Sequence, residues 1–84
     1  MQQVHKYILG VGDDITQMPV GAQPLSVAFQ GDQLVMWALV DVDAPMKGRQ
    51  FIVRGTGHNI RLTNIGFIGT AFIDNLVFHV FEIL

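Results

Sequence analysis

The sequence contains no cysteine, which excludes disulfide bonds, thiolate nucleophiles and cysteine-based zinc sites. It also lacks any apolar run close to the roughly 18 residues that a membrane-spanning helix needs. Its first residues, MQQVHKYIL, have neither the basic start nor the continuous apolar segment of a signal peptide. We therefore expect a soluble, unprocessed protein of the cytosol that has no membrane partner.

Charged residues are scarce as well, at 14% of the chain, and the formal net charge is −2. A chain with this balance lacks the basic surface that displaces counterions from nucleic acid, so we exclude general nucleic-acid binding. The acids are unevenly distributed, because none occurs between Ala44 and Ile73, where four of the five Lys and Arg residues lie. One segment is therefore positive and the rest of the chain leans negative.

Half of the residues are hydrophobic, which is a high share for a chain of 84 residues. We expect one domain, residues 1–84, and a domain of this size buries only about 60% of the surface of its unfolded chain. Some apolar surface must then be covered by a partner, and a second copy of the chain is the simplest one. The composition therefore predicts a homo-oligomer.

Two hairpins are predicted by short turns between apolar, β-rich runs. Gly31-Asp32 and Asp74-Asn75 are two-residue turns of residue types that tolerate positive φ. The expected pairs in the first hairpin are Phe29–Leu34, Ala28–Val35, Val27–Met36, Ser26–Trp37 and Leu25–Ala38. The expected pairs in the second hairpin are Ile73–Leu76, Phe72–Val77, Ala71–Phe78 and Thr70–His79.

Three further segments fit the same plan: VHKYIL, DDITQM after a Gly10–Gly12 turn, and RQFIVRG. A helix over QLVMWALV is the alternative for that segment, but the flanking turn and the missing cap favour a strand. The sequence thus predicts an all-β fold, a small antiparallel sandwich or barrel of about six to eight strands.

The last strand, LVFHVFEIL, is apolar on both faces instead of alternating. Its hairpin partner behaves in the same way. We expect one face, or an exposed edge, to be buried in the homo-oligomer. The alternative is a wrapped barrel that buries both sides within one chain.

The sequence offers few candidate catalytic or metal-binding residues. Ser26 is the one serine, and it lies inside a predicted strand without a nucleophile elbow. The three histidines, His5, His58 and His79, are far apart in the sequence and do not have the close spacing typical of metal ligands. His79 is expected to be a half-buried residue satisfied by Thr70. Asp41 and Asp43 either hold a divalent cation or bond local amides in a turn. We predict no catalytic residue, no metal ligand and no cofactor.

The stretch FIVRGTGHNIR is the one credible ligand site. Backbone amides of a glycine-containing turn can converge on an anion, and arginine and histidine can add contacts to phosphate. The candidate ligand-binding residues are Arg54, Gly55, Thr56, Gly57, His58 and Arg61, with Trp37 or a phenylalanine stacking on a base. The alternative is a tight glycine-rich bend with arginines on its wet face, because the GxGxxG spacing and a following helix start are missing.

Several motifs occur together in a fixed order along the chain. They are KYIL, MPVGA followed by PLSV, WALVD, FIVRGTGH, IGT and VFHVFE. This succession resembles a family of small uncharacterised proteins of tailed phages and prophages, and GTGH and HVFE are its most distinctive parts. The resemblance implies a phage accessory protein acting in the host bacterial cytoplasm, and it implies no particular activity.

A small phage accessory protein without catalytic residues is expected to act by binding. The leading hypothesis is a non-enzymatic, homo-oligomeric protein that counters host defence by sequestering a small anionic, nucleotide-type signal molecule. The alternative is an inhibitor or scaffold that docks on a host or phage protein through a strand edge or an apolar face. A third hypothesis is an enzyme that hydrolyses phosphodiesters with His58 as general base, but the sequence shows no further catalytic residues to support it.

Overall fold

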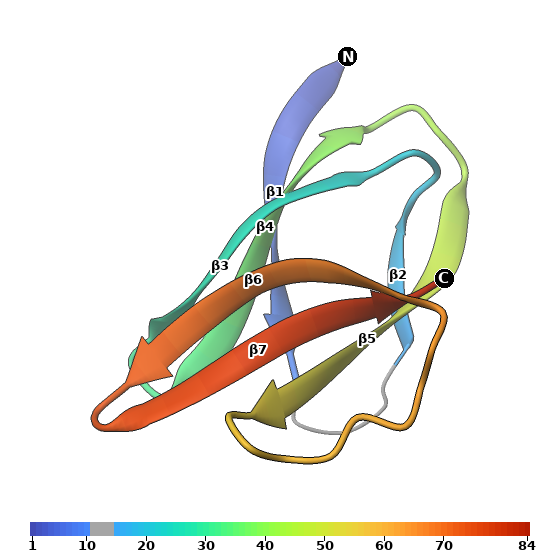
Figure 1. Cartoon of the computed structure of the whole chain (residues 1–84). Helices are drawn as coiled ribbons and strands as arrows, with labels where there is room; N and C mark the ends of the chain where they lie inside the picture. The colour runs from blue at the N-terminus through green and yellow to red at the C-terminus, as the bar shows by residue number, and fades with distance from the viewer. Residues whose placement is uncertain (11–14) are drawn as a thin grey trace.

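A computed structural model describes residues 1–10 and 15–84, and within these residues the chain forms seven strands (Figure 1). The strands are β1 (Gln2–Leu9), β2 (Ile15–Pro19), β3 (Gln23–Gln30), β4 (Gln33–Asp41), β5 (Met46–Gly55), β6 (Ile65–Ile73) and β7 (Leu76–Ile83). The predicted DDITQM strand begins at Ile15, while Asp13, Asp14 and most of the Gly10–Gly12 turn lie outside the described residues.

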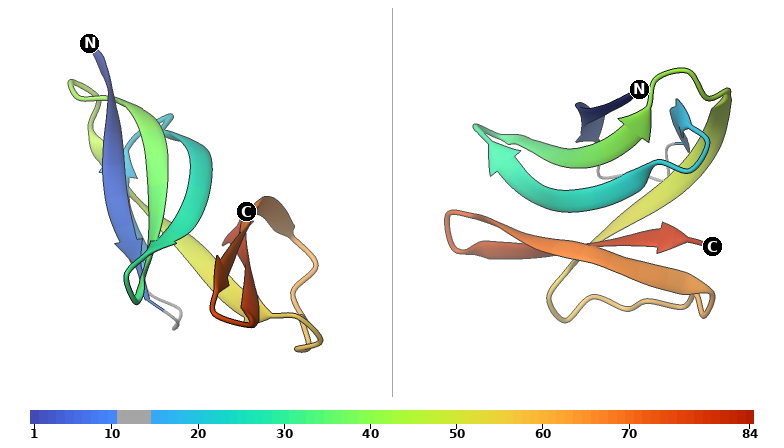
Figure 2. Two further views of the ribbon diagram at one scale, coloured as in Figure 1. Left: turned by 90° about the vertical axis from the view of Figure 1, so that its left-hand side faces the viewer. Right: turned by 90° about the horizontal axis from the view of Figure 1, so that it is seen from above.

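The strands build two antiparallel sheets packed face to face, as Figure 2 shows. One sheet has the order β1-β4-β3 and the other has the order β2-β5-β7-β6. The all-β prediction of six to eight antiparallel strands is therefore confirmed, in its sandwich form. QLVMWALV is part of strand β4, so the helical alternative for this segment is wrong.

Both predicted hairpins are present with their turns in the expected conformation. Gly31 has φ 61° and Asp74 has φ 51°, the left-handed region that these turns require. Every predicted pair of the β6–β7 hairpin is observed. In the β3–β4 hairpin one pair is wrong, because Ala38 lies opposite Pro24 and not Leu25. A bulge between Pro24 and Ser26 adds the extra residue, next to a proline that has no amide hydrogen for the ladder.

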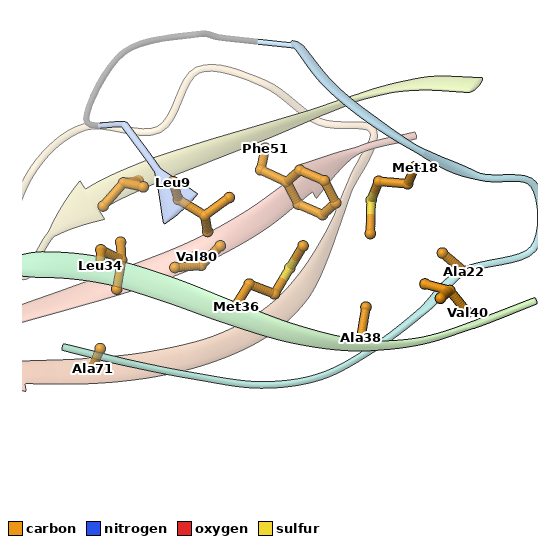
Figure 3. Close-up of a cluster of buried hydrophobic side chains, with 11 residues drawn as sticks. Leu9, Met18, Ala22, Leu34, Met36, Ala38, Val40, Phe51, Ala71 and Val80 are labelled. Atoms are coloured by element: carbon orange, nitrogen blue, oxygen red, sulfur yellow. The ribbon is translucent and has the colours of Figure 1, made fainter. Parts of the chain in front are cut away.

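The core lies between the sheets and is built mainly from alternate residues of the strands (Figure 3). Strand β4 contributes Leu34, Met36, Ala38 and Val40, which face Phe51 and Val80 from the other sheet. Met36 and Val80 are completely buried. No charged or polar residue is buried in the described part of the chain, so the interior between the two layers is apolar.

The C-terminal hairpin is apolar on both faces, as the sequence predicted. Val80 and Ala71 lie in the core, whereas Phe67 and Phe72 on the opposite face remain 63% and 68% exposed. A barrel that wraps both sides of these strands is therefore ruled out. Nothing in the described part of the chain covers these two rings, so a partner can contact them on the outer side of the hairpin.

Strands β3 and β6 approach each other closely at Gly69. A Cβ atom there would lie 2.8 Å from Cγ2 of Val27, whose branched side chain packs against the core. We expect Gly69→Ala to lower the free energy of unfolding by about 1–3 kcal/mol through overpacking. Gly66→Ala is the matched control, because its Cβ would meet only Leu84 at 3.6 Å. Urea unfolding at equal protein concentration checks this, and equal midpoints for both variants would contradict it.

Candidate functional site

The GTGH segment forms a tight turn that follows β5. The amide of His58 donates to the carbonyl of Gly55 at 3.1 Å, and Gly57 has φ 85°, as the third residue of a type II turn requires. The amide of Thr56 donates to the carbonyl of Val77 on β7 at 3.2 Å. Two of the amides that we expected to face an anion are therefore bonded to backbone carbonyls, and charged contacts must come from side chains.

The imidazole of His58 packs against its own turn. A Cβ atom on Gly55 would lie 2.9 Å from Cε1 of His58, so only glycine lets the ring lie so close to the backbone. Together with the β6–β7 turn, this loop borders a cavity of about 230 Å³. The lining residues are Gly55, Thr56, His58, Asn75, Leu76, Val77 and Phe78. Pockets for drug-sized ligands measure about 300–1,000 Å³, so this cavity holds only part of such a molecule.

Arg54 and Arg61 lie in different surroundings. Arg54 is half-buried on the side of β5 that faces away from the core, and its guanidinium donates to the carbonyl of Val53 at 3.0 Å. Arg61 is exposed in the segment between β5 and β6. Arg54 is therefore the preorganised cation of the predicted pair.

His79 lies next to Arg54 and has both ring nitrogens hydrogen-bonded. Nδ1 is 3.0 Å from Oγ1 of Thr70, and Nε2 is 2.8 Å from Oγ1 of Thr56. The prediction of a half-buried His79 satisfied by Thr70 is thus confirmed. Sequence reasoning missed the bond to Thr56, which ties the loop to β7 and joins residues 23 positions apart without any local pattern.

These side chains form a polar row across three strands. In the ladder Arg54 of β5 lies opposite His79 of β7, which lies opposite Thr70 of β6. An apolar row runs beside it, with Ile52, Phe81 and Phe67 opposite one another and the two phenylalanine rings 5.6 Å apart. We call this side the outer face of the four-stranded sheet: Ile52, Arg54, Phe67, Thr70, Phe72, Val77, His79 and Phe81. Ile52 is completely buried on this side, so it is not part of the accessible surface.

Chemically, the outer face combines a cation with aromatic rings. Arginine makes paired hydrogen bonds to phosphate or carboxylate oxygens, and exposed phenylalanine rings offer stacking surfaces. A flat molecule bearing an acidic group matches both features. The only hydroxyls bonded to His79 among the described residues are those of Thr56 and Thr70, and each occupies one ring nitrogen.

Trp37 does not join this surface within one chain. It lies on β4 between Lys6 of β1 and Ser26 of β3, on the side of the three-stranded sheet that faces away from the core. Within a single copy, the aromatic residues on the same side of the sheet as Arg54 are Phe81 on the neighbouring strand β7 and Phe67 and Phe72 on the next strand, β6. The sequence could not show that Trp37 and Arg54 lie on different sheets. The alternation of residues along β4 shows only which face of its own sheet Trp37 occupies.

Asp41 and Asp43 form the local turn that was one of their two predicted roles. The amide of Asp43 donates to Oδ1 of Asp41 at 3.0 Å, and the amide of Ala44 donates to the Asp41 carbonyl at 3.1 Å. The hydrogen bond from Asp43 is the main cause that lowers the pKa of Asp41. No group of three or more histidine or acidic side chains suited to a metal occurs in residues 1–10 and 15–84.

Arg49 and Glu82 form an ion pair at the other end of β5. Nε of Arg49 lies 2.6 Å from Oε2 of Glu82, and Nη2 of Arg49 lies 2.7 Å from Oε1. Nη1 of Arg49 donates to the carbonyl of Ala22. The hydrogen bonds to Glu82 are the largest cause that raises the pKa of Arg49. Because Ala22 precedes β3, the pair links β5 and β7 to the other sheet.

Comparison with known proteins places this all-β chain in a family. A family model described as a domain of unknown function, DUF7352, matches residues 1–83, and the chain belongs to that family. No curated protein and no solved structure matches the chain. Among the described residues, no helix has the length and apolar character needed to cross a membrane.

Proposed function

We propose that the chain is a non-enzymatic binding protein that sequesters a small anionic, nucleotide-type molecule as a homo-oligomer. The observation that carries this proposal is the outer face of the four-stranded sheet, where Arg54 of β5 shares one side with the exposed Phe67 and Phe72 of β6, across the intervening strand β7. Phosphate contacts and ring stacking are the two interactions that hold a nucleotide.

The small loop cavity favours a site shared between copies. Its volume of about 230 Å³ is less than a nucleotide needs, so the remainder of the ligand would contact the outer face of a second copy. Sequestration requires tight binding without turnover, and it needs only the contacts that Arg54 and the aromatic rings of this face can make. The resemblance to small phage proteins supplies the setting, in which such a molecule is a defence signal in the cytoplasm of the host bacterium.

The arginines give the direct test. We expect the double variant Arg54→Ala, Arg61→Ala to bind nucleoside phosphates or cyclic nucleotides at least about tenfold more weakly, because a hydrogen bond to a charged group contributes about 1.5–3 kcal/mol. Isothermal titration calorimetry against a panel of these compounds measures the change. Lys6→Ala, on the other sheet, is the control and should leave the affinity unchanged. If the double variant binds with the same affinity as the wild type, the proposed binding site is wrong.

The exposed phenylalanines also support a second candidate function, docking on a host or phage protein. Two aromatic side chains that are 63% and 68% exposed form the kind of apolar patch that marks protein interfaces. This function predicts a stoichiometric protein partner in a pulldown that Phe72→Ser abolishes, together with no affinity for any compound of the nucleotide panel.

A further inference from the structure

A second and larger cleft lies at the opposite end of β5 from the GTGH turn. Its volume is about 860 Å³, within the range of ligand-binding pockets. It is lined by β2, the β2–β3 turn, the first half of β5 and the end of β7. Gly48 in this cleft and Gly55 in the turn are seven residues apart on one strand, which corresponds to about 20 Å. The two sites are therefore independent.

The strand register explains why the cleft exists. β5 pairs with β2 through Met46–Gln50 and with β7 through Gln50–Gly55, so β7 ends where β2 begins to pair. A Cβ atom on Gly48 would lie 2.8 Å from Cγ2 of Ile15 and 3.1 Å from Nε2 of Gln17. Glycine at this position lets both side chains lie across the strand and form one wall.

Among residues 1–10 and 15–84, the charged side chains that line the cleft are Lys47, Arg49 and Glu82, and they sum to one positive charge. Arg49 and Glu82 neutralise each other in their bidentate pair. Lys47 is exposed and has no ion-pair partner among residues 1–10 and 15–84. Arg49 donates three hydrogen bonds of the five that a guanidinium can make, so two N–H groups remain for a ligand.

We propose that this cleft binds a small organic anion, a phosphate or carboxylate attached to an apolar or aromatic body. Lys47 and the remaining N–H groups of Arg49 bind the acidic group. Ile15, Val20 and Ile83 contact the apolar body. The sequence had grouped Lys47 and Arg49 with Arg54 and Arg61 in one positive segment. The structure places Lys47 and Arg49 at this cleft and Arg54 at the other end of β5.

Titration of the ¹⁵N-labelled full chain with phenyl phosphate tests the proposal by two-dimensional NMR. We expect saturable shifts of the amides of Gly21, Lys47 and Gly48, and no saturable shifts there with the neutral analogue benzyl alcohol. Lys47→Met should weaken phenyl phosphate binding at least about fivefold, and Lys47→Arg should retain it. Lys6→Met is the matched control, since Lys6 is an exposed lysine on β1 that bonds Gln30.

Lys47 is exposed, so the spectrum of the free variant should show an intact fold. Non-saturable shifts in the cleft, or equal affinity of Lys47→Met and wild type, would overturn the proposal. Saturable shifts confined to Gly55–Gly57 that disappear in Arg54→Ala would also overturn it, while supporting the site on the outer face. Cleft shifts that persist in Arg54→Ala would support this inference whatever happens to the proposed function.

Discussion

Glu82→Ala is expected to lower the free energy of unfolding by about 3 kcal/mol, which is a large fraction of the stability of a domain of this size. The side chains of Arg49 and Glu82 are only 18% and 12% exposed, so removing the carboxylate leaves a largely desolvated guanidinium without its partner. Glu82 also holds the Arg49 guanidinium in the position from which it donates to the Ala22 carbonyl. Losing Glu82 therefore weakens the link to the β1-β4-β3 sheet.

Urea unfolding followed by the fluorescence of Trp37 measures this loss, at a fixed protein concentration because assembly also affects apparent stability. The control is the double variant Arg49→Met, Glu82→Leu, which removes both charges and keeps the volume. It should lose less stability than Glu82→Ala, since the main cost is the unpaired charge. A change below about 0.5 kcal/mol in Glu82→Ala would show that the pair contributes nothing beyond a surface contact.

Phe67→Ser combined with Phe72→Ser is expected to weaken self-association at least about a hundredfold, because burying each phenylalanine contributes about 1.5–3 kcal/mol. Both side chains are mostly exposed in the single chain, so the stability of the isolated fold should change little. Sedimentation velocity over a range of micromolar concentrations measures the association.

The matched control replaces Val4 and Ile8 with serine. These residues are 56% and 59% exposed on β1, in the other sheet. This control should associate like the wild type. If the control dissociates and the phenylalanine variant does not, the interface lies on the three-stranded sheet and the proposed shared site is wrong.

Much of the fold could be predicted from the sequence because it depends on local rules. Turn residues with positive φ fixed both hairpins, and the register of β6–β7 followed from Asp74-Asn75. The bulge at Leu25 could not be predicted, because a turn sets the register only until a residue is inserted into one strand.

The candidate site was only partly predictable, since it depends on contacts between distant segments. The sequence pointed to Arg54 and to the turn after it, and the acid-free stretch explains why. It could not show that Thr56 and His58 donate their amides to carbonyls. It also could not place Trp37 on the other sheet, because the pairing of sheets is set by packing and not by the pattern of one strand.

Native mass spectrometry of the purified, unheated chain tests the central claim most directly, which is that copies of this chain join to hold a small anion. The predicted result is a species at a multiple of 9.3 kDa that carries a phosphorylated small molecule and releases it on heating. A bare monomer of 9.3 kDa at micromolar concentration would contradict both the shared site and the role of the exposed phenylalanines.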